Sequence, residues 1–294
     1  MRLQDFDNGE RYRARILSNS AITAPGAAEE VRELALEVEC SKFDFSIGQS
    51  VGVILEGPFR QSERLDMEIG HAHHFRLYTV ADTPAINARG KPEIKLCVRR
   101  CHYIDEHSGE EYPGIASNYL CDRKTDDIIT INGPFGLPFD VPADKDADLL
   151  LIGMGTGIAP FRAFVKHLYR DVGDWRGRVR LFHGARSGLE MLYKNDQVDD
   201  FTQYYDEETF QAFQAVSPRP HWGDPADMCK SLLEKGEDVL AILRSDAGYV
   251  YVAGREDTLA SLENIFATLL GSAEEWQALK RDKSASAHWR ELIY

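Results

Sequence analysis

The stretch that decides the fold is Leu149-Leu-Leu-Ile-Gly-Met-Gly-Thr-Gly-Ile-Ala-Pro-Phe-Arg162. It begins with apolar residues typical of a buried strand and passes through glycines into a segment whose proline suits the first turn of a helix. A strand that enters a helix through a glycine-rich turn directs backbone N–H groups and the positive helix end toward a phosphate. We therefore expect a phosphate-binding turn at Gly155, Thr156, Gly157 and Pro160.

Outward from this turn, strand-like and helical runs alternate through the second half of the chain. The strand-like runs cover residues 148–152, 179–183, 210–216, 248–252 and 288–294, and the helical runs cover 160–170, 226–243 and 255–270. Alternation of this kind predicts a parallel sheet with crossover helices. The expected fold of residues 147–294 is an α/β doubly wound domain with a five-stranded parallel sheet.

The first half of the chain has a different pattern. Short runs rich in β-formers cover residues 51–55, 75–80, 93–98 and 127–131, each bounded by Gly, Pro or Asp. Several such strands before the polar segment 142–148 predict an antiparallel β-barrel domain over residues 1–143. One helix is expected to start near Ser117 and Asn118, which offer N-cap chemistry.

Composition restricts the class of protein. The chain has 294 residues, of which 43% are hydrophobic and 28% charged, as in ordinary globular proteins. It has no apolar run of about 20 residues, the length that spans a bilayer, and its first residues lack a signal-peptide core. Five cysteines without a Cys-x-x-Cys pair predict reduced thiols in the cytoplasm and no metal site. The net charge of −14 argues against a nucleic-acid or anionic membrane surface.

A second motif, Arg76-Leu-Tyr-Thr79, precedes the glycine-rich turn. On a strand, Arg76 and Tyr78 share one face, and Thr79 points the other way unless a bulge intervenes. A guanidinium can bind a pyrophosphate with two hydrogen bonds, and a tyrosine ring can stack on a flat heterocycle. Taken alone, the motif is also compatible with an ordinary strand that carries a surface arginine.

Several motifs together resemble one family. They are Arg76-Leu-Tyr-Thr79, Leu96-Cys-Val-Arg-Arg100, Gly114-Ile-Ala-Ser-Asn-Tyr-Leu-Cys-Asp122, Gly133-Pro-Phe-Gly136, Gly153-Met-Gly-Thr-Gly-Ile-Ala-Pro160 and the terminal Trp289-Arg-Glu-Leu-Ile-Tyr294. In residues and in order, these resemble the plant-type ferredoxin–NADP(+) reductases. The resemblance implies a barrel that binds FAD and an α/β domain that binds NADP(H).

The resemblance implies an FAD that is not covalently linked. Arg76 and Ser117 would hold its pyrophosphate, Tyr78 would face one side of the isoalloxazine, and Thr79 would lie near the flavin N5. Tyr103 falls where the family stacks a tyrosine on the adenine, although an exposed loop aromatic is the alternative. Further FAD contacts are expected at Leu77, Cys97, Val98, Arg99, Ile115, Ala116, Thr156 and Tyr294. Cys97 is expected to be a small packed residue and not a nucleophile.

For the pyridine nucleotide, the resemblance implies contacts at the glycine-rich turn and at Ala185, Arg186, Ser217, Arg219, Ala253 and Gly254. In the family, a serine followed by arginine binds the 2′-phosphate of NADP, but here Pro218 intervenes and delays the arginine to Arg219. The arginines could equally form a solvated rim around an NAD site. No acidic residue ends the third strand of this half, which favours NADP(H), and NAD(H) remains an alternative.

Two departures from the family pattern lie near the expected chemistry. Ala253 stands where the family usually has a cysteine near the nicotinamide, and Leu292 stands where it has a glutamate. Glu291 lies one position earlier, so either a local bulge restores its carboxylate or proton delivery differs in this chain. The terminal Tyr294 would cover the flavin face where the nicotinamide lands. The expected catalytic residues are therefore Thr79, Glu291 and Tyr294.

The resemblance predicts electron transfer between NADPH and a separate one-electron carrier, such as a ferredoxin or flavodoxin, in either direction. The alternatives are a reductase component that feeds an oxygenase-system iron–sulfur protein, and a flavin-binding subunit or sensor with weakened hydride chemistry. Because such carriers are acidic, a docking patch is expected among the basic residues Arg60, Arg64, Arg89, Lys91, Lys95, Arg99 and Arg100. These could instead form a solvated face. The sequence leaves the oligomeric state open.

Overall fold

The computed structural model describes residues 9–59, 71–104, 109–136, 139–194, 199–204, 207–216 and 228–293. Contacts divide the chain into two units, Met1–Ala21 with Glu29–Pro138 and Ile22–Ala28 with Phe139–Tyr294. This differs from the predicted bounds of 1–143 and 147–294. The backbone N–H of Ala24 donates to the carbonyl of Leu189 at 3.2 Å, and the ring of Phe139 stacks on Phe161 at 5.8 Å. These contacts place residues 22–28, and the chain from Phe139 onward, in the second unit.

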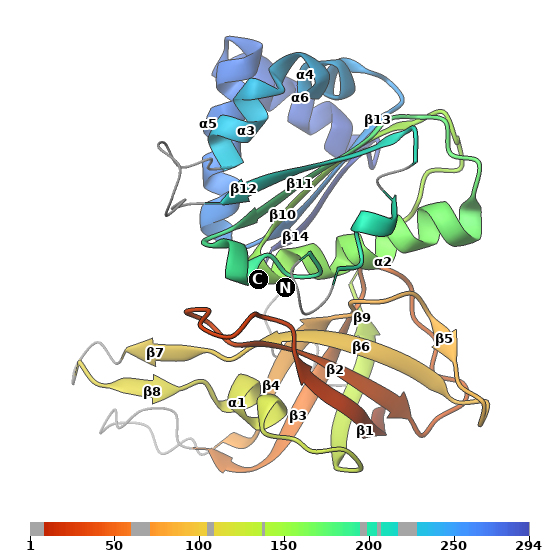
Figure 1. Cartoon of the computed structure of the whole chain (residues 1–294), viewed down its shortest axis with the longest axis vertical. Helices are drawn as coiled ribbons and strands as arrows, with labels where there is room; N and C mark the ends of the chain where they lie inside the picture. Colours follow the sequence, from red (N-terminus) through yellow and green to blue (C-terminus); the bar gives the residue numbers. More distant parts are fainter. Residues whose placement is uncertain are drawn as a thin grey trace. The chain divides into compact units, whose positions relative to one another are not determined.

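The first unit is built on an antiparallel sheet (Figure 1). Its elements are β1 (Arg11–Ala21), β2 (Val31–Val38), β3 (Ser50–Phe59), β4 (His71–Thr79), β5 (Ala85–Ile86), β6 (Pro92–Arg99), β7 (His102–Ile104), β8 (Glu111–Pro113), α1 (Ile115–Cys121) and β9 (Ile128–Phe135). The strand order is β4-β3-β9-β1-β2-β6-β5, and β7 and β8 form a separate hairpin. Val80, directly after β4, forms a bridge with Leu96 of β6. This bridge joins the first strand of the order to the sixth and closes the sheet into the predicted barrel.

Alternating side chains fill the interior of the barrel. Fully buried positions recur at every second residue along the strands, as a half-buried sheet requires: Ala14, Ile16, Leu34, Leu36, Val51, Val53, Ile94, Leu96, Val98, Ile129 and Ile131. The four predicted strands are confirmed as parts of β3, β4, β6 and β9. Strands β1 and β2 are elements that the sequence pattern did not indicate, because only two residues of β1 are buried and charged residues interrupt β2.

The second unit is built on a parallel sheet. Its elements are β10 (Asp148–Met154), a 3₁₀ turn (Gly155–Ile158), α2 (Ala159–His167) with a π-helical turn (Leu168–Val172), β11 (Val179–Ala185), 3₁₀ turns (Gly188–Glu190 and Thr202–Tyr204), β12 (Phe210–Val216), α3 (Met228–Glu234), α4 (Gly236–Arg244), β13 (Gly248–Gly254), α5 (Glu256–Leu270), α6 (Ala273–Ala285) and β14 (Trp289–Ile293). The strand order β12-β11-β10-β13-β14 confirms the predicted doubly wound sheet.

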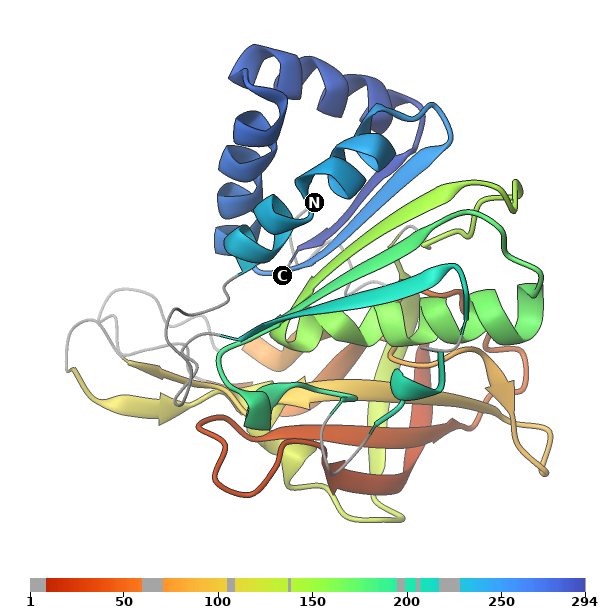
Figure 2. The ribbon, with the colours of Figure 1, turned by 45° about the horizontal axis from the view of Figure 1, so that its top comes forward.

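Helices cover both faces of this sheet (Figures 1 and 2). Phe164 of α2 contacts Tyr251 of β13 on one face, with ring centroids 4.9 Å apart, and helices α3 to α6 pack on the other face around Phe266. The prediction of one helix over residues 226–243 is wrong, because α3 and α4 are separated at Lys235. There, a side chain at Gly236 would meet Leu269 at 2.8 Å. Helix α6 is a further element that the sequence pattern did not indicate.

None of the helices among the described residues is both long enough and apolar enough to cross a membrane.

Candidate functional site

The predicted flavin motif lies at the end of β4. Arg76 is exposed, and its guanidinium donates only to the neighbouring carbonyl of Phe75, at 2.8 Å, among the hydrogen bonds of its described surroundings. Tyr78 is partly buried against the barrel core. Burial raises the pKa of Tyr78, the thiols of Cys101 and Cys121 raise it further, and Arg76 opposes them, so the phenol stays protonated. The hydroxyl of Thr79 shares a hydrogen bond of 3.1 Å with that of Ser50. Strand β4 thus carries an exposed guanidinium at Arg76, a packed ring at Tyr78 and a hydrogen-bonded hydroxyl at Thr79.

The helix α1 begins earlier than predicted. The predicted helix near Ser117 and Asn118 is present, but its N-cap is Gly114, without a side-chain cap, so the expected N-cap role of Ser117 and Asn118 is wrong. Ser117 instead lies in the first turn, is 7% exposed, and accepts a hydrogen bond of 3.1 Å from the backbone N–H of Cys101. A side chain at Gly114 would lie 3.0 Å from the Ser117 hydroxyl, which explains a glycine at the N-cap. Ser117 therefore joins the start of α1 to the end of β6.

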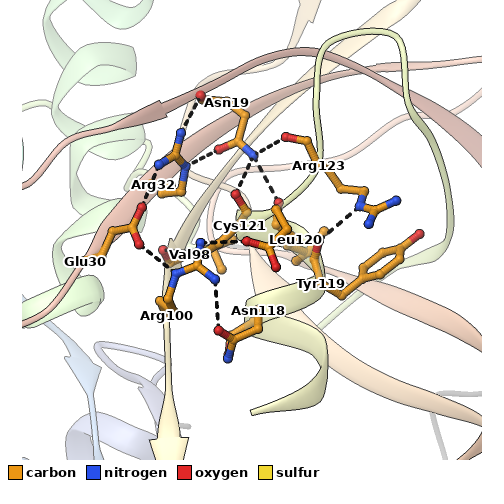
Figure 3. A network of polar contacts seen from close by, with 12 residues as sticks. Asn19, Glu30, Arg32, Val98, Arg100, Asn118, Tyr119, Leu120, Cys121 and Arg123 are labelled. Atoms are coloured by element: carbon orange, nitrogen blue, oxygen red, sulfur yellow. Dashed lines mark hydrogen bonds and ion pairs between the residues drawn. The ribbon is translucent and has the colours of Figure 1, made fainter. Parts of the chain in front are cut away.

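Arg100 fixes the position of this helix (Figure 3). Its guanidinium donates to Glu30 at 2.6 Å, to the side chain of Asn118 at 2.9 Å and to Asp122 at 2.9 Å. Asn118 in turn donates to the carbonyl of Cys101 at 2.9 Å. One arginine therefore joins the middle and the C-cap of α1 to the loop before β2. The sequence indicated Arg100 only as part of a motif and as a candidate docking residue, because its partners lie on other elements.

Asn19 of β1 also binds the C-terminal end of α1 (Figure 3). Its amide donates to the carbonyls of Leu120, Cys121 and Arg123 at 2.7 to 3.2 Å. The last carbonyls of a helix have no partner within the helix, so a side-chain donor there stabilises the helix end. Nothing in the local sequence indicates this role, because Asn19 meets α1 across a separation of more than 100 residues.

Tyr103 lies on the exposed hairpin β7–β8. Its ring is stacked on that of Tyr112, its register partner on the other strand, at 5.8 Å and 28°. The two rings are 54% and 40% exposed, so an aromatic surface is open for stacking. Cys97 and Val98 of β6 are buried, as predicted for Cys97, while the guanidinium of Arg99 is held by the carboxylate of Glu29 at 3.1 Å.

The remaining expected flavin contacts lie on the same framework. Leu77 is half-buried on β4, Ile115 packs against the barrel core, and Ala116 is fully buried on α1. Helix α1 contacts both β4 and β6. The structure thus gathers the flavin positions predicted in the first half around one strand end and one helix.

In the second unit, the glycine-rich turn is pressed against β13. A Cβ atom at Gly157 would lie 2.2 Å from the carbonyl oxygen of Ala253 and 2.9 Å from the backbone nitrogen of Gly254. Gly155 instead has a φ of +54°, and nothing lies within 4 Å of the place that its Cβ would take. The two glycines therefore serve different purposes, close packing on a strand for Gly157 and an open left-handed turn for Gly155. Pro160 lies in the first turn of α2, as predicted.

One row of residues crosses the sheet beside this turn. Gly153 of β10 is the register partner of both His183 and Ala253, and Ala253 is the partner of Leu292. Partners in register point to the same face of a sheet, here the face of α2. His183 is 2% exposed, and its Nε2 atom has no hydrogen-bond partner among the described residues. Burial, with a smaller effect of Lys194, lowers its pKa to about 3.

Glu291 lies on the opposite face from this row. The register of β13 and β14 runs without interruption from Trp289 to Ile293, so no bulge turns the carboxylate around. Glu291 accepts a hydrogen bond of 2.5 Å from the indole of Trp289 and pairs with Lys280 of α6 at 2.8 Å. Of the two alternatives left open by the sequence, the uninterrupted register excludes the local bulge. Glu291 instead binds Trp289 and Lys280.

The ends of β11 and β12 carry the other expected nucleotide contacts. Ala185 is buried at the last position of β11 and pairs in register with Val216, while Arg186 follows it on the exposed surface. Ser217, Arg219 and Tyr294 lie outside the described residues. Thr156 lies in the 3₁₀ turn between Gly155 and Gly157.

The candidate docking patch differs from its prediction. Arg60 and Arg64 lie outside the described residues. The five others, Arg89, Lys91, Lys95, Arg99 and Arg100, each lie within 4 Å of a carboxylate of this chain. Neighbouring strands and loops supply these acids, so the five cations are paired within the chain.

Comparisons with known proteins agree with these features. The oxidoreductase NAD-binding domain family matches residues 151–262. The ferredoxin–NADP reductase of Synechocystis sp. is 27% identical over 289 residues, which cover 96% of this chain and 67% of that protein. The chloroplastic leaf isozyme 1 of Arabidopsis thaliana is 29% identical over 291 residues, covering 96% and 77%. The solved structure of ferredoxin–NADP+ reductase from Plasmodium falciparum superposes with a TM-score of 0.70 at 16% identity over 97% of both chains, which shows a shared fold. Over almost its whole length this chain is therefore similar to ferredoxin–NADP reductases, and it shares their two-domain fold.

Proposed function

We propose that this chain is an FAD-dependent oxidoreductase that transfers electrons between NADPH and a one-electron carrier protein. The observation that carries the proposal is the presence of two differently built nucleotide sites in one chain. The first site lies where the end of β4 meets α1. The second is the turn at Gly155–Ile158, which packs against β13. A flavin supplies the exchange between a two-electron hydride and single electrons.

In the first unit, four residues are proposed to bind and orient the FAD. Arg76 has a guanidinium free to pair with a pyrophosphate, and Ser117 lies in the first turn of a helix that Arg100 holds in place. Tyr78 offers a neutral ring that is fixed by packing. The hydroxyl of Thr79 bonds to Ser50 and retains capacity for one more hydrogen bond, which suits a contact with the flavin N5.

Tyr103 and Tyr112 form a platform on which an adenine can stack. Base–aromatic stacking contributes about 1–3 kcal/mol per base. Leu77, Cys97, Val98, Arg99, Ile115 and Ala116 shape the surroundings of the same cofactor. The Arg76→Ala variant is expected to lose FAD during gel filtration, and full retention of FAD would remove Arg76 from the site.

In the second unit, the turn at Gly155, Thr156 and Gly157 offers backbone N–H groups to the nucleotide pyrophosphate. Ala185 and Arg186 line the neighbouring strand end, and Ser217 with Arg219 would bind a 2′-phosphate. Arg219→Ala is expected to narrow the preference for NADPH over NADH, and an unchanged preference would remove Arg219 from this role. Deletion of Tyr294 is expected to tighten nicotinamide binding by freeing the flavin face.

Ferredoxin is the proposed carrier, on the strength of the names of the relatives. Flavodoxin and an oxygenase-system iron–sulfur protein are alternatives that share all of these residues, and NAD(H) is the alternative donor. The proposed location is the cytoplasm, and the proposed chemistry allows electron flow in either direction.

A second function is favoured by one observation, the adjacent apolar pair Ala253 and Leu292. Without a thiol and a carboxylate at these positions, hydride transfer could be slow enough that the chain serves as a flavin-binding subunit or sensor. The intact glycine-rich turn at residues 153–160 argues against this, because a site that had lost its nucleotide chemistry need not keep so many glycines.

The test is anaerobic stopped-flow reduction of the purified yellow protein with NADPH and with NADH in parallel. Fast bleaching by NADPH alone supports the proposal, and fast bleaching by NADH keeps the enzyme but changes the donor. Slow bleaching by both, with FAD bound, would favour the sensor.

A further inference from the structure

Helix α1 depends on other elements for its position, and the inference from this dependence rests on the proposed function. The helix is seven residues long, its N-cap Gly114 has no side-chain cap, and neither an acid in the first turn nor a base in the last turn supports it. A helix this short is marginal in water by itself. Side chains from other elements therefore have to hold it beside β4.

Those side chains form a closed ring of hydrogen bonds with the helix (Figure 3). The α1 ring is defined by Asn19, Glu30, Arg32 and Arg100. On one side, Arg100 donates to the side chain of Asn118 in the middle of α1 at 2.9 Å. On the other side, the amide of Asn19 donates to two of the last carbonyls of α1 at 3.1 and 3.2 Å. The ring thus grips the helix at two places.

Glu30 and Arg32 close the ring at a distance from the helix. One carboxylate oxygen of Glu30 accepts from Arg100 at 2.6 Å, and the other accepts from Arg32 at 2.6 Å. Arg32 also donates to the side-chain oxygen and the backbone carbonyl of Asn19, at 2.6 and 2.9 Å. Among the described residues, no side-chain hydrogen bond of Glu30 or Arg32 goes to α1. An effect of these two residues on the helix therefore passes through Arg100 and Asn19.

The carboxylate of Glu30 is the part of the ring that depends most on charge. Each of its oxygens binds a different arginine, and a glutamine would offer one acceptor oxygen in place of two. Burial raises the pKa of Glu30, but hydrogen bonds from Arg32 and Arg100 hold this pKa below its ordinary value. The carboxylate is therefore ionised at neutral pH, and its hydrogen bonds are charge-assisted and stronger than neutral ones.

Ser117 connects the ring to the proposed pyrophosphate site. Its hydroxyl accepts a hydrogen bond of 3.1 Å from the backbone N–H of Cys101, the residue directly after Arg100. Helix α1 also contacts β4, the strand that carries Arg76. A shift of α1 would therefore move Ser117 relative to Arg76, and these two side chains are proposed to hold the pyrophosphate of FAD.

We propose that Glu30 and Arg32 are positioning residues for the FAD pyrophosphate, which act through the α1 ring. Tyr78 and Thr79, the proposed contacts of the isoalloxazine, lie on β4 and have no part in this ring. Loss of the ring should therefore weaken the binding of FAD and leave that of riboflavin unchanged, because riboflavin has the same isoalloxazine but no phosphate.

The experiment measures the dissociation constants of FAD and of riboflavin for the full-length apoprotein, from the quenching of flavin fluorescence. The test variant is Arg32→Met, which removes the bonds to Glu30 and Asn19. We expect FAD to bind at least about tenfold more weakly, since hydrogen bonds between charged groups are lost, and riboflavin to bind as before. The matched control is Arg13→Met, which removes the same charge from an exposed pair with Glu39 outside the ring.

Equal weakening of FAD and riboflavin in Arg32→Met would overturn the proposal, because a merely structural role would disturb both ligands. A loss of FAD affinity no larger than in Arg13→Met would overturn it as well. Failure of the unaltered chain to bind FAD would instead count against the proposed function itself. Tight FAD binding by the unaltered chain, with no effect of Arg32→Met, would count only against the positioning role.

Glu30→Gln gives a second test that keeps the shape of the side chain, and it decides the question if Arg32→Met does not fold. It is expected to weaken FAD binding several-fold and to leave riboflavin binding unchanged. In the double variant Glu30→Gln/Arg32→Met the loss should be close to that of Arg32→Met alone, because both changes open the same ring. Losses that multiply would show that the two residues act separately, and the α1 ring would then not be the unit that positions FAD.

Discussion

Ala253 and Leu292 are register partners on the neighbouring parallel strands β13 and β14, and both point to the face of the sheet that α2 covers. Each stands where the family resemblance implies a functional side chain, a thiol at 253 and a carboxylate at 292. The two departures are therefore one local change, in which a pair of apolar side chains replaces a pair of reactive ones. Ala253 is fully buried and Leu292 is half-buried.

The double variant Ala253→Cys/Leu292→Glu tests this pair. If the apolar pair limits hydride transfer, the variant is expected to accelerate flavin reduction by NADPH by up to about 100-fold, the rate effect that improved alignment of reacting groups can give. Stopped-flow bleaching checks the rate. Each single variant should give less than half of the combined effect in free energy, because neighbouring groups are coupled. An unchanged rate in the double variant, with FAD bound, would show that the pair does not limit the reaction.

Gly157 and Gly155 should respond differently to alanine. In Gly157→Ala the new methyl group would lie 2.2 Å from the carbonyl oxygen of Ala253, so the turn must leave β13. We expect loss of NADPH-driven reduction and a lower melting temperature, with FAD retained. Gly155→Ala meets no atom within 4 Å and costs about 1–2 kcal/mol for its left-handed backbone. Similar losses in both variants would contradict the separate roles of the two glycines.

Arg100→Met should weaken FAD binding even if Arg100 does not itself contact FAD, because Arg100 positions α1. The substitution removes the bonds to Glu30, Asn118 and Asp122 that hold α1. Hydrogen bonds to charged groups contribute about 1.5–3 kcal/mol each, so FAD affinity is expected to fall by at least about tenfold. Fluorescence release of FAD measures the affinity. Arg176→Met is the control, because its pair with Asp146 is exposed, and FAD loss equal to that control would exclude a positioning role.

His183 makes folding sensitive to acid. Its pKa is about 3 in the folded chain, below the ordinary value of 6.5. As the pH falls below 6.5, the unfolded chain takes up a proton and the folded chain does not, so stability decreases until the pH reaches about 3. The loss from this residue is about 2 kcal/mol at pH 5.

His183→Leu should therefore flatten the decrease in urea midpoint between neutral pH and pH 5. His167→Gln is the matched histidine control, because His167 is half-exposed and lies beside Asp171 on the surface. The same slope in His183→Leu as in the wild type would show that His183 is not the acid-sensitive group.

Much of the second unit could be predicted because short stretches of its sequence specify each strand, turn and helix. A run of apolar residues, glycines and Pro160 specifies strand, turn and helix within a few residues, and the structure contains each of them. Alternation of strands and helices then leaves few topologies. The flavin motif was recognised for the same reason, since Arg76, Tyr78 and Thr79 are neighbours on one strand.

The parts that could not be predicted depend on distant contacts. Asn19 and Arg100 hold α1 from other elements, and no local pattern distinguishes them from surface polar residues. A glycine is needed at position 157 because the backbone of Ala253, almost 100 positions away in sequence, leaves no room for a Cβ atom. The approach of a phosphate alone does not explain it. The ion pairs of the candidate docking residues could not be predicted, because counting cations in the sequence does not reveal which acids fold beside them.

The bridge between Val80 and Leu96 that closes the barrel has a consequence for the flavin strand. The backbone N–H of Ala81 continues this bridge by donating to the carbonyl of Lys95 at 2.7 Å, and β4 pairs with β3 along its other side. Amide hydrogens in such a strand exchange with deuterium only when the barrel opens as a whole. Slow exchange at Leu77 to Ala81 should therefore persist after FAD is removed. The apoprotein would keep its cofactor strand assembled and could be reloaded with flavin analogues without refolding.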